Sequence, residues 1–476
     1  MADDEQVIGV ALSGGGHRAS LFGLGALLYL IDAGKGPRLG SVASVSGGSI
    51  TNAFIGGAID LKHATPSEMR RHAGVLASQI VHRGTLWASL ITYAYLSFIA
   101  LLVIVAIFVS RANTPSWAIA LVWVAATGLV GWLAQRRSAV VAMAFDKTVF
   151  HGARLADMHR AVSHVLCATD LQTGQHVYFS SEFVYAWRTG WGTPGDLRAS
   201  RAAQASAALP GAFSVVPIRL SRFGLPEDRI VAERNPPKQF KLLDGGVYDN
   251  MASEWLLHMG EPLTDGSPPG SLRPVTEAIV VNASAGDDVT NRPWVTVPLV
   301  GELASLLAVK DVMYRQTTAV RRRLLNIRYQ IAQDRQRIQP GARSLEQALP
   351  GATVQINRSP FNLPDRFAGG RFGGDGFAER AAAVIAALGE ANRDYWLAEA
   401  DANRRVKTTL SRIDSPRAQS LIRHGYTLTM ANCHVLLGYP LLNVPAVEDI
   451  APLVSKQKSD NDSLQTTLNR DASFPN

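Results

Sequence analysis

The chain is poor in cysteine and lacks several patterns that mark well-known classes of protein. Cys167 and Cys433 are its only cysteines in 476 residues. Two cysteines exclude a disulfide framework and a metal site built from cysteine, and they fit a reduced cytosolic compartment. Residues 1–5 are mainly acidic and lack the order of basic, apolar and small residues that defines a signal peptide. We therefore expect no disulfide, no signal peptide, no metal and no cofactor.

Nucleic-acid signatures are also missing, although the chain is basic. The net charge is +8, from 47 Lys and Arg against 39 Asp and Glu, and apolar residues make up 47% of the chain. Such a charge suits either nucleic acid or an anionic membrane surface. Since no zinc-finger or RNA-recognition pattern occurs, we expect no nucleic-acid partner. The high apolar content instead indicates a membrane segment.

Two long uncharged runs supply such a segment. Residues 91–110 and 117–134 contain no Asp, Glu, Lys or Arg, and only residues 111–116 separate them. Each run can cross a hydrocarbon core of about 30 Å, and the short connection requires an antiparallel pair. Arg136 and Arg137 follow the pair, so the positive-inside rule places both flanks in the cytosol. The alternative is a helical hairpin buried in a globular core.

Two strand–turn–helix patterns near the N-terminus carry residues suited to acyl transfer. An apolar strand over residues 7–12 leads into three glycines at 14–16, and a second strand over residues 41–45 ends at Ser46. A direct turn from strand to helix strains the corner residue and requires small neighbours. The Ser46 hydroxyl would then stand at the edge of the sheet, while the glycine N–H groups could approach an oxyanion closely. One turn offers a nucleophile and the other offers anion-binding donors.

Each turn has a simpler interpretation when it is taken alone. Ser-Gly-Gly after an apolar run is usually only a strand-to-helix turn, and Gly-Gly-Gly after a strand could cradle a nucleotide phosphate. The glycine spacing fits neither a dinucleotide loop nor a P-loop. The two turns together, in two successive strand–helix units, favour a reaction site.

A carboxylate follows a later strand in the same manner. The apolar stretch 240–243 ends at Asp244, which two glycines follow. Sites in open α/β sheets gather at the carboxyl ends of the strands, so Asp244 would lie at the same edge as Ser46. The alternative is an Asx turn without catalytic importance.

Four stretches in this order resemble the patatin-like phospholipase family. They are residues 14–18 for its oxyanion loop, residues 44–48 for its nucleophile elbow, residues 205–213 for its helix-end motif and residues 244–246 for its catalytic aspartate motif. The resemblance implies a Ser46–Asp244 dyad that works without a histidine. Ser44 and Ala19 depart from it, because glycine usually stands at these positions in the family.

The resemblance also assigns the neighbouring residues. It implies that Gly14, Gly15, Gly16 and Gly47 bind the oxyanion and substrate, and that Arg18 orients the glycine loop or meets a lipid phosphate. A Ser–His–Asp triad is the rival mechanism, and His17 inside the glycine loop is the histidine to test for it.

The fold class that follows is an α/β three-layer sandwich with a mostly parallel central sheet, interrupted by a transmembrane hairpin and followed by a helical C-terminal region. The expected division is residues 1–60 and 151–290 for the catalytic domain, 61–150 for the insertion, 291–440 for a helical part, and 441–476 for a disordered tail. Sequence alone leaves the oligomeric state open.

The expected function is a membrane-anchored serine acyl hydrolase acting on phospholipid or lysophospholipid esters, with its catalytic domain on the cytoplasmic side of the bilayer. The alternative is a weakly active or inactive relative that serves as a membrane-tethered binding or regulatory protein. A transporter is disfavoured, because neither uncharged run contains an intramembrane charge that could form an ion path.

Overall fold

A ten-stranded mixed sheet forms the centre of the computed structural model, which describes residues 6–112, 114–225, 237–258, 274–284, 292, 297, 301–334, 348–370 and 376–456. The strands are β1 (Ile8–Leu12), β2 (Leu39–Ser44), β3 (Ser163–Asp170), β4 (Gln175–Phe179), β5 (Val184–Ala186), β6 (Gly190–Gly192), β7 (Val216–Arg219), β8 (Gln239–Asp244), β9 (Glu277–Asn282) and β10 (Gly351–Gln355). The acidic residues 1–5 and the tail beyond 456 lie outside the described residues.

One half of the sheet is parallel, in the order β10-β9-β1-β2-β3. Val10 of β1 lies opposite Val42 of β2 and Ile279 of β9. The other half is antiparallel: β3 pairs with β4 and β8, β5 and β6 extend the β4 edge, and β7 pairs with β8. The strand β10 falls inside the region expected to be helical, so the sheet gains an edge that the sequence interpretation did not include.

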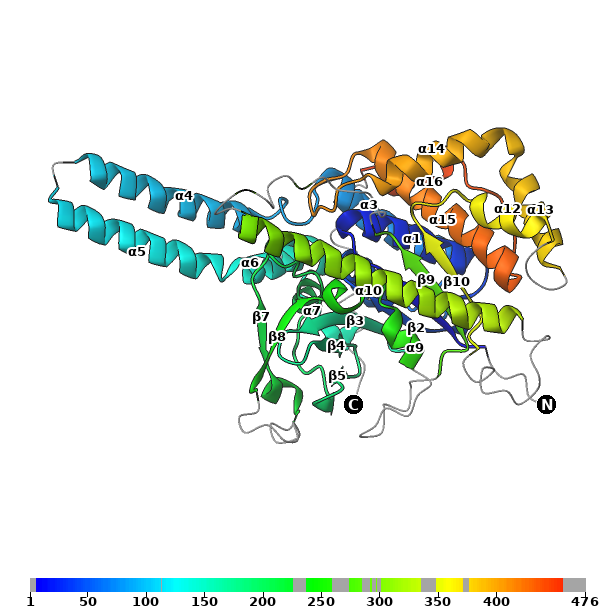
Figure 1. Cartoon of the computed structure of the whole chain (residues 1–476), viewed down its shortest axis with the longest axis horizontal. Helices are drawn as coiled ribbons and strands as arrows, with labels where there is room; N and C mark the ends of the chain where they lie inside the picture. The colour runs from blue at the N-terminus through cyan, green and yellow to red at the C-terminus, as the bar shows by residue number, and fades with distance from the viewer. Residues whose placement is uncertain are drawn as a thin grey trace.

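Helices cover both faces of the sheet, which gives three layers (Figure 1). Alternate residues of β1 point to opposite sides: Val10 belongs to the core cluster shared with α1 and α15, and Ala11 to the cluster shared with α9 and α10. The helices that build these layers and the C-terminal region are α1 (Gly16–Asp32), α2 (Gly47–Ala58), α3 (Pro66–His82), α6 (Arg137–Phe145), α7 (Ala199–Ser206), α8 (Gly246–Asp249), α9 (Ser253–His258), α10 (Gly301–Gln333), α12 (Asn362–Ala368), α13 (Phe377–Leu388), α14 (Arg393–Arg404), α15 (Ser415–Leu437) and α16 (Val447–Val454).

The C-terminal helices join the main core through a close contact between α1 and α15. A Cβ added to Gly25 would lie 2.1 Å from Ile422 O, and one added to Gly425 would lie 2.1 Å from Phe22 O. Only glycine allows the two backbones to approach this closely. The final helix α16 also packs on this core through its buried residue Ile450. The expectation of a disordered tail from residue 441 is therefore wrong for 447–454, because these residues bury an apolar face.

Two apolar helices leave the body of the molecule as an antiparallel hairpin, α4 (Leu90–Arg111) and α5 (Ser116–Ala134) (Figure 1). Both are long and apolar enough to cross a membrane, and only 11% and 6% of their most apolar windows are buried. The Tyr95 hydroxyl donates to Leu133 O at 2.9 Å, so the start of α4 lies beside the end of α5. This exposure excludes the alternative of a hairpin buried in the globular core.

Candidate active site

Ser46 occupies a strained corner between β2 and α2. Its φ of 54° and ψ of −118° are values that residues other than glycine rarely adopt. The Gly48 N–H holds the turn by donating to Ser13 O and Val45 O, at 3.2 and 3.0 Å. A Cβ on Gly47 would lie only 2.0 Å from Gly16 O, so the glycine after the corner is required by close backbone contact. The strain expected from the sequence is present at this serine.

Hydrogen bonds among buried serines hold the Ser46 corner in place. The Ser46 N–H donates to both oxygens of Ser206, O at 3.2 Å and Oγ at 3.0 Å. The Ser206 hydroxyl donates to Cys167 O at 2.6 Å and lies 2.8 Å from the Ser49 hydroxyl, which donates to Ser44 Oγ at 3.0 Å. Ser44, one of the two departures from the family pattern, thus takes part in the hydrogen bonds that hold the turn.

Asp244 ends β8 at the same edge of the sheet. Its side chain is only 2% exposed, and its Oδ1 accepts the Gly246 N–H at 2.8 Å. The Gly245 N–H donates to Ser206 O at 3.1 Å, and this is the carbonyl that also accepts the Ser46 N–H. The end of α7 therefore holds the serine corner and the aspartate segment next to each other.

Ser46 and Asp244 line one cavity of about 560 Å³, together with Gly14, Gly15, Gly16 and Arg18. Much of the remaining wall is apolar and comes from distant parts of the chain: Leu86, Trp87, Ala207, Leu209, Ala212, Phe213 and Leu410. Its volume lies within the range of roughly 300–1,000 Å³ that small-molecule sites occupy. The cavity combines a hydroxyl, a carboxylate and an apolar surface.

Backbone N–H groups beside Ser46 are available to an anion. Within the part of the chain that the structure describes, the N–H groups of Gly15, Gly16 and Gly47 donate no hydrogen bond. Gly16 and Gly47 begin α1 and α2, where helix N–H groups have no partner in the helix and favour negative charge. The Gly14 N–H differs, because it donates to Asn250 O at 3.0 Å. Gly14 thus shapes the loop but does not offer a donor.

Arg18 fixes the glycine loop to the rest of the protein. It is 2% exposed, and its guanidinium donates to Ala283 O at 2.9 Å and to Val406 O. Burial lowers the pKa of Arg18 to about 10, which still leaves it charged near neutral pH. Of the two roles expected for Arg18, these contacts favour orientation of the loop.

Two further residues belong to the site, and neither followed from the sequence. Asn250 accepts the Gly14 N–H and donates from Nδ2 to Ser284 Oγ at 2.7 Å, so it braces the glycine loop. Tyr314 of α10 lines the cavity beside Asp244: burial raises its pKa, and the Asp244 carboxylate raises it further. Asn250 lies a few residues after the aspartate motif, so the sequence could have indicated it as a site residue. Tyr314 lies in a long helical pattern in which no sequence feature distinguishes it from its neighbours.

The histidines do not converge on Ser46. His17 is fully buried and contacts Ser411 O at 2.7 Å and Thr85 Oγ1 at 3.0 Å, and His176 contacts Gly245 O at 2.9 Å. Burial lowers the pKa of both to about 4. Among the residues described, no histidine lines the cavity, and no group of three or more His, Cys, Asp or Glu could hold a metal.

The sequence matches no protein-family model and no curated protein. Among solved structures, the chain is similar to human GIVD cytosolic phospholipase A2 at 11% identity, with a TM-score of 0.45, and to the same enzyme in complex with methyl gamma-linolenyl fluorophosphonate, with a TM-score of 0.41. The match covers 96% of this chain and spans 61% of the length of those chains. VipD from Legionella pneumophila is similar at 13% identity, with 89% and 92% of the two chains covered and a TM-score of 0.25. With sequence identities of 11–13% and TM-scores of at most 0.45 for these structures, a functional proposal has to come from the geometry of the site.

Proposed function

We propose that this protein is a serine acyl hydrolase of the patatin-like type, which cleaves phospholipid or lysophospholipid esters with Ser46 and Asp244. The observation that carries the proposal is the shared cavity, which a serine at a strained corner and a buried carboxylate both line, beside backbone N–H groups that donate no hydrogen bond. Strain at a non-glycine corner marks functional positions, because the surrounding structure has to maintain it.

The chemistry follows from these groups. Asp244 accepts the proton of the Ser46 hydroxyl as Oγ attacks the ester carbonyl carbon, and the N–H groups of Gly15, Gly16 and Gly47 stabilise the oxyanion. The alcohol portion leaves with the proton, and Ser46 carries the acyl group. A water molecule then gives a proton to Asp244 as its oxygen attacks the acyl carbon. The bond from that carbon to Ser46 Oγ breaks, Asp244 returns the proton to Oγ, and the fatty acid leaves. Each well-placed oxyanion donor contributes roughly 3–4 kcal/mol to this barrier reduction.

The wall of the cavity supports a membrane lipid as the substrate. Leu209, Phe213 and Leu410 offer an apolar surface for an acyl chain. Trp87 also lines the cavity, is 41% exposed and lies just before α4, with its ring 6.3 Å from that of Tyr93. Such aromatic residues favour the membrane–water interface. If α4 and α5 cross the bilayer, the cavity opens beside the membrane surface on its cytoplasmic side.

The test compares fatty-acid release from phosphatidylcholine vesicles and labelling by a fluorophosphonate probe. Ser46→Ala is expected to abolish labelling, and Ser46→Ala and Asp244→Asn each to reduce release by roughly 10³-fold or more. The matched controls are Ser67→Ala and Asp394→Asn, which change exposed residues on α3 and α14 and should retain full activity.

Thermal unfolding of each variant separates loss of chemistry from loss of fold. A folded wild-type protein that neither reacts with the probe nor releases fatty acid would contradict the proposal and favour the tethered binding protein instead. Release that survives in Ser46→Ala would place the nucleophile elsewhere.

A further inference from the structure

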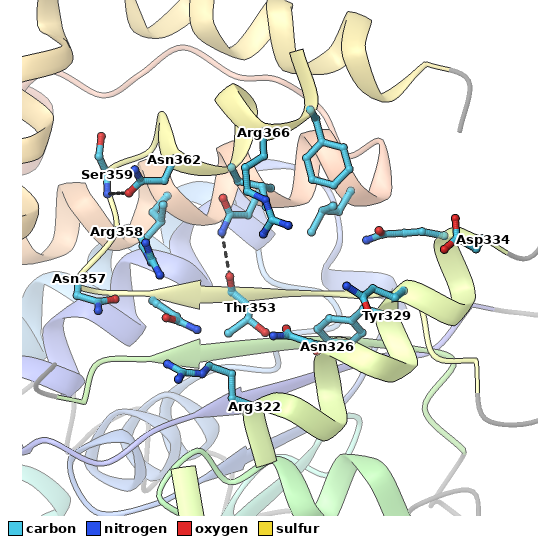
Figure 2. Close-up of a pocket in the computed structure, with 18 residues that line it drawn as sticks. Arg322, Asn326, Tyr329, Asp334, Thr353, Asn357, Arg358, Ser359, Asn362 and Arg366 are labelled. Carbon is cyan, nitrogen blue, oxygen red and sulfur yellow. Dashed lines mark hydrogen bonds between the residues drawn. The ribbon is translucent and has the colours of Figure 1, made fainter. Parts of the chain in front are cut away.

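A second cavity, of about 530 Å³, lies at the edge strand β10 and belongs to no part of the site described above. It is bounded by β10 and the segment 357–359 after it, the C-terminal half of α10, α12 and one side of α15 (Figure 2). In Figure 1 these elements stand at the end of the molecule opposite to the α4–α5 hairpin. We propose that this cavity binds a soluble phosphorylated polyol, a small molecule that carries phosphate groups and free hydroxyls.

Three arginines from three different elements give the cavity its charge. Arg322 comes from α10, Arg358 from the segment after β10, and Arg366 from α12, against the single aspartate Asp334. Figure 2 shows Arg366 extending toward Thr353 of β10, with Asp334 at the far end of the cavity from Arg358. Guanidinium groups are the preferred partners of phosphate, because their fork geometry matches two phosphate oxygens. This composition therefore predicts an anion at the arginine-rich end.

A buried side-chain amide, that of Asn432, favours a ligand that carries hydroxyl groups in addition to phosphate. Asn432 of α15 lines the cavity and is only 5% exposed. Its Nδ2 donates to Thr353 O at 2.9 Å, whereas its Oδ1 has no hydrogen-bond partner among the described residues. Because an unpaired buried acceptor destabilises the folded state, this oxygen points to a donor from outside the protein. A phosphate ester that is fully ionised offers no donor, but a polyol hydroxyl does.

The position of the cavity distinguishes a soluble ligand from a lipid headgroup. The hairpin would fix one end of the molecule at the bilayer, and the elements that bear the arginines lie at the other end (Figure 1). A headgroup in the same membrane could not reach them. The long helix α10 connects the two sites, since Tyr314 lines the catalytic cavity and Arg322 lines this one. A ligand here would thus contact the helix that packs against Asp244.

The experiment measures binding of myo-inositol hexakisphosphate to the full chain in detergent micelles, by calorimetry and by the rise in Tm. We expect saturable binding, weakened roughly tenfold or more by Arg358→Gln and by Arg366→Gln, because each change removes a charge-assisted hydrogen bond. Both arginines are exposed, so the fold should survive. Arg219→Gln, an exposed arginine on β7, is the matched control and should bind as the wild type does.

Two comparisons make the test specific. Asn432→Asp keeps the shape of the side chain but adds a negative charge, and it should weaken binding at least tenfold, with circular dichroism confirming the fold. Binding that is absent in the wild type, or equal in the wild type and both arginine variants, would overturn the proposal. Binding that requires vesicles containing phosphatidylinositol phosphates, and fails with the soluble probe, would overturn the assignment to a soluble ligand.

Discussion

Single residues at the serine corner have little freedom to change. Gly47 is the clearest case, because the oxygen of Gly16 occupies the position that a side chain would need. The same helix offers a contrasting position: a Cβ added to Gly57 would meet no heavy atom within 4 Å. Residue type at Gly47 is therefore set by backbone packing between α1 and α2, and not by helix propensity.

The first prediction compares these two glycines. Gly47→Ala should lower the free energy of unfolding by about 1–3 kcal/mol, since the glycine loop must move, and should slow fluorophosphonate labelling at least tenfold. Gly57→Ala should leave labelling unchanged and stabilise the protein by up to about 1 kcal/mol. Chemical denaturation and labelling rates check both changes, and equal behaviour of the two variants would contradict the tight contact at Gly47.

The second prediction concerns pH and His17. Burial lowers the pKa of this imidazole from 6.5 to about 4, although its hydrogen bond to Ser411 O acts in the other direction. The unfolded chain thus binds a proton between pH 6.5 and 4 that the folded chain does not bind. Stability is lost as the pH falls through this range, and the share of His17 is about 3 kcal/mol.

In the variant His17→Gln, residue 17 no longer binds a proton in the unfolded chain, so its contribution to the pH dependence of stability is lost. The difference in unfolding free energy between pH 7 and pH 4 should be smaller in the variant than in the wild type. Since His164, His176 and His424 are also buried with lowered pKa values, part of the pH dependence should remain. An unchanged difference would show that His17 is not held neutral in the folded protein.

At the scale of elements, a charged substitution should affect membrane insertion in the α4–α5 hairpin but not in the helices that cover the sheet. Val124 lies in the middle of α5 and is 70% exposed, whereas Val447 of α16 is 42% exposed on the body of the protein. Val124→Arg should cost roughly 2.5–3.5 kcal/mol of membrane insertion. It should therefore lower the fraction of protein that resists alkaline extraction from membranes. Val447→Arg should leave that fraction unchanged. If the two variants are extracted alike, a hairpin that crosses the bilayer is excluded.

The sequence predicted those elements that a short stretch of consecutive residues is enough to identify. β1, β2 and the turns after them follow from short apolar runs that end in small residues, and the end of β8 follows from the Asp244 motif. The helical character of α10 agrees with the prediction for residues 291–440, but its position beside the catalytic cavity had no signal in the sequence. Arg321 of α10 pairs with Glu254 and lies over the Tyr248 ring at 5.2 Å, so this arginine packs within the protein.

Other features depend on contacts between distant segments and had no local signal. The strand β10 is short and occurs among helices, and only its pairing with β9 identifies it as part of the sheet. Tyr314 is an ordinary helical residue until α10 crosses the catalytic cavity. The bond from Ser46 to Ser206 joins parts of the chain that are 160 residues apart. The strained turn at Ser46 was therefore predictable, whereas the distant segments that hold it were not.

At the scale of the whole molecule, the hairpin and the catalytic unit should contribute separately to activity. Replacing residues 90–134 by a short Gly/Ser linker is feasible, because Tyr95 contacts Leu133 and the two ends lie together. Hydrolysis of phospholipid in vesicles should fall at least tenfold if the hairpin tethers the protein to the bilayer, because a tether raises the local concentration of substrate. Hydrolysis of a soluble short-chain ester should change less than twofold. Equal losses on both substrates would show that the hairpin is needed for the fold itself.

The order of the chain has a consequence for biosynthesis. Ser41 of β2 pairs with Ser163 of β3, and the whole hairpin lies between them. A ribosome therefore makes Ser46 first, then the two apolar helices, and only afterwards β3, the end of α7 and Asp244. Under the proposed mechanism, the nascent polypeptide has a serine without its base until Asp244 has been made. Hydrolysis would then begin only after both apolar helices are complete.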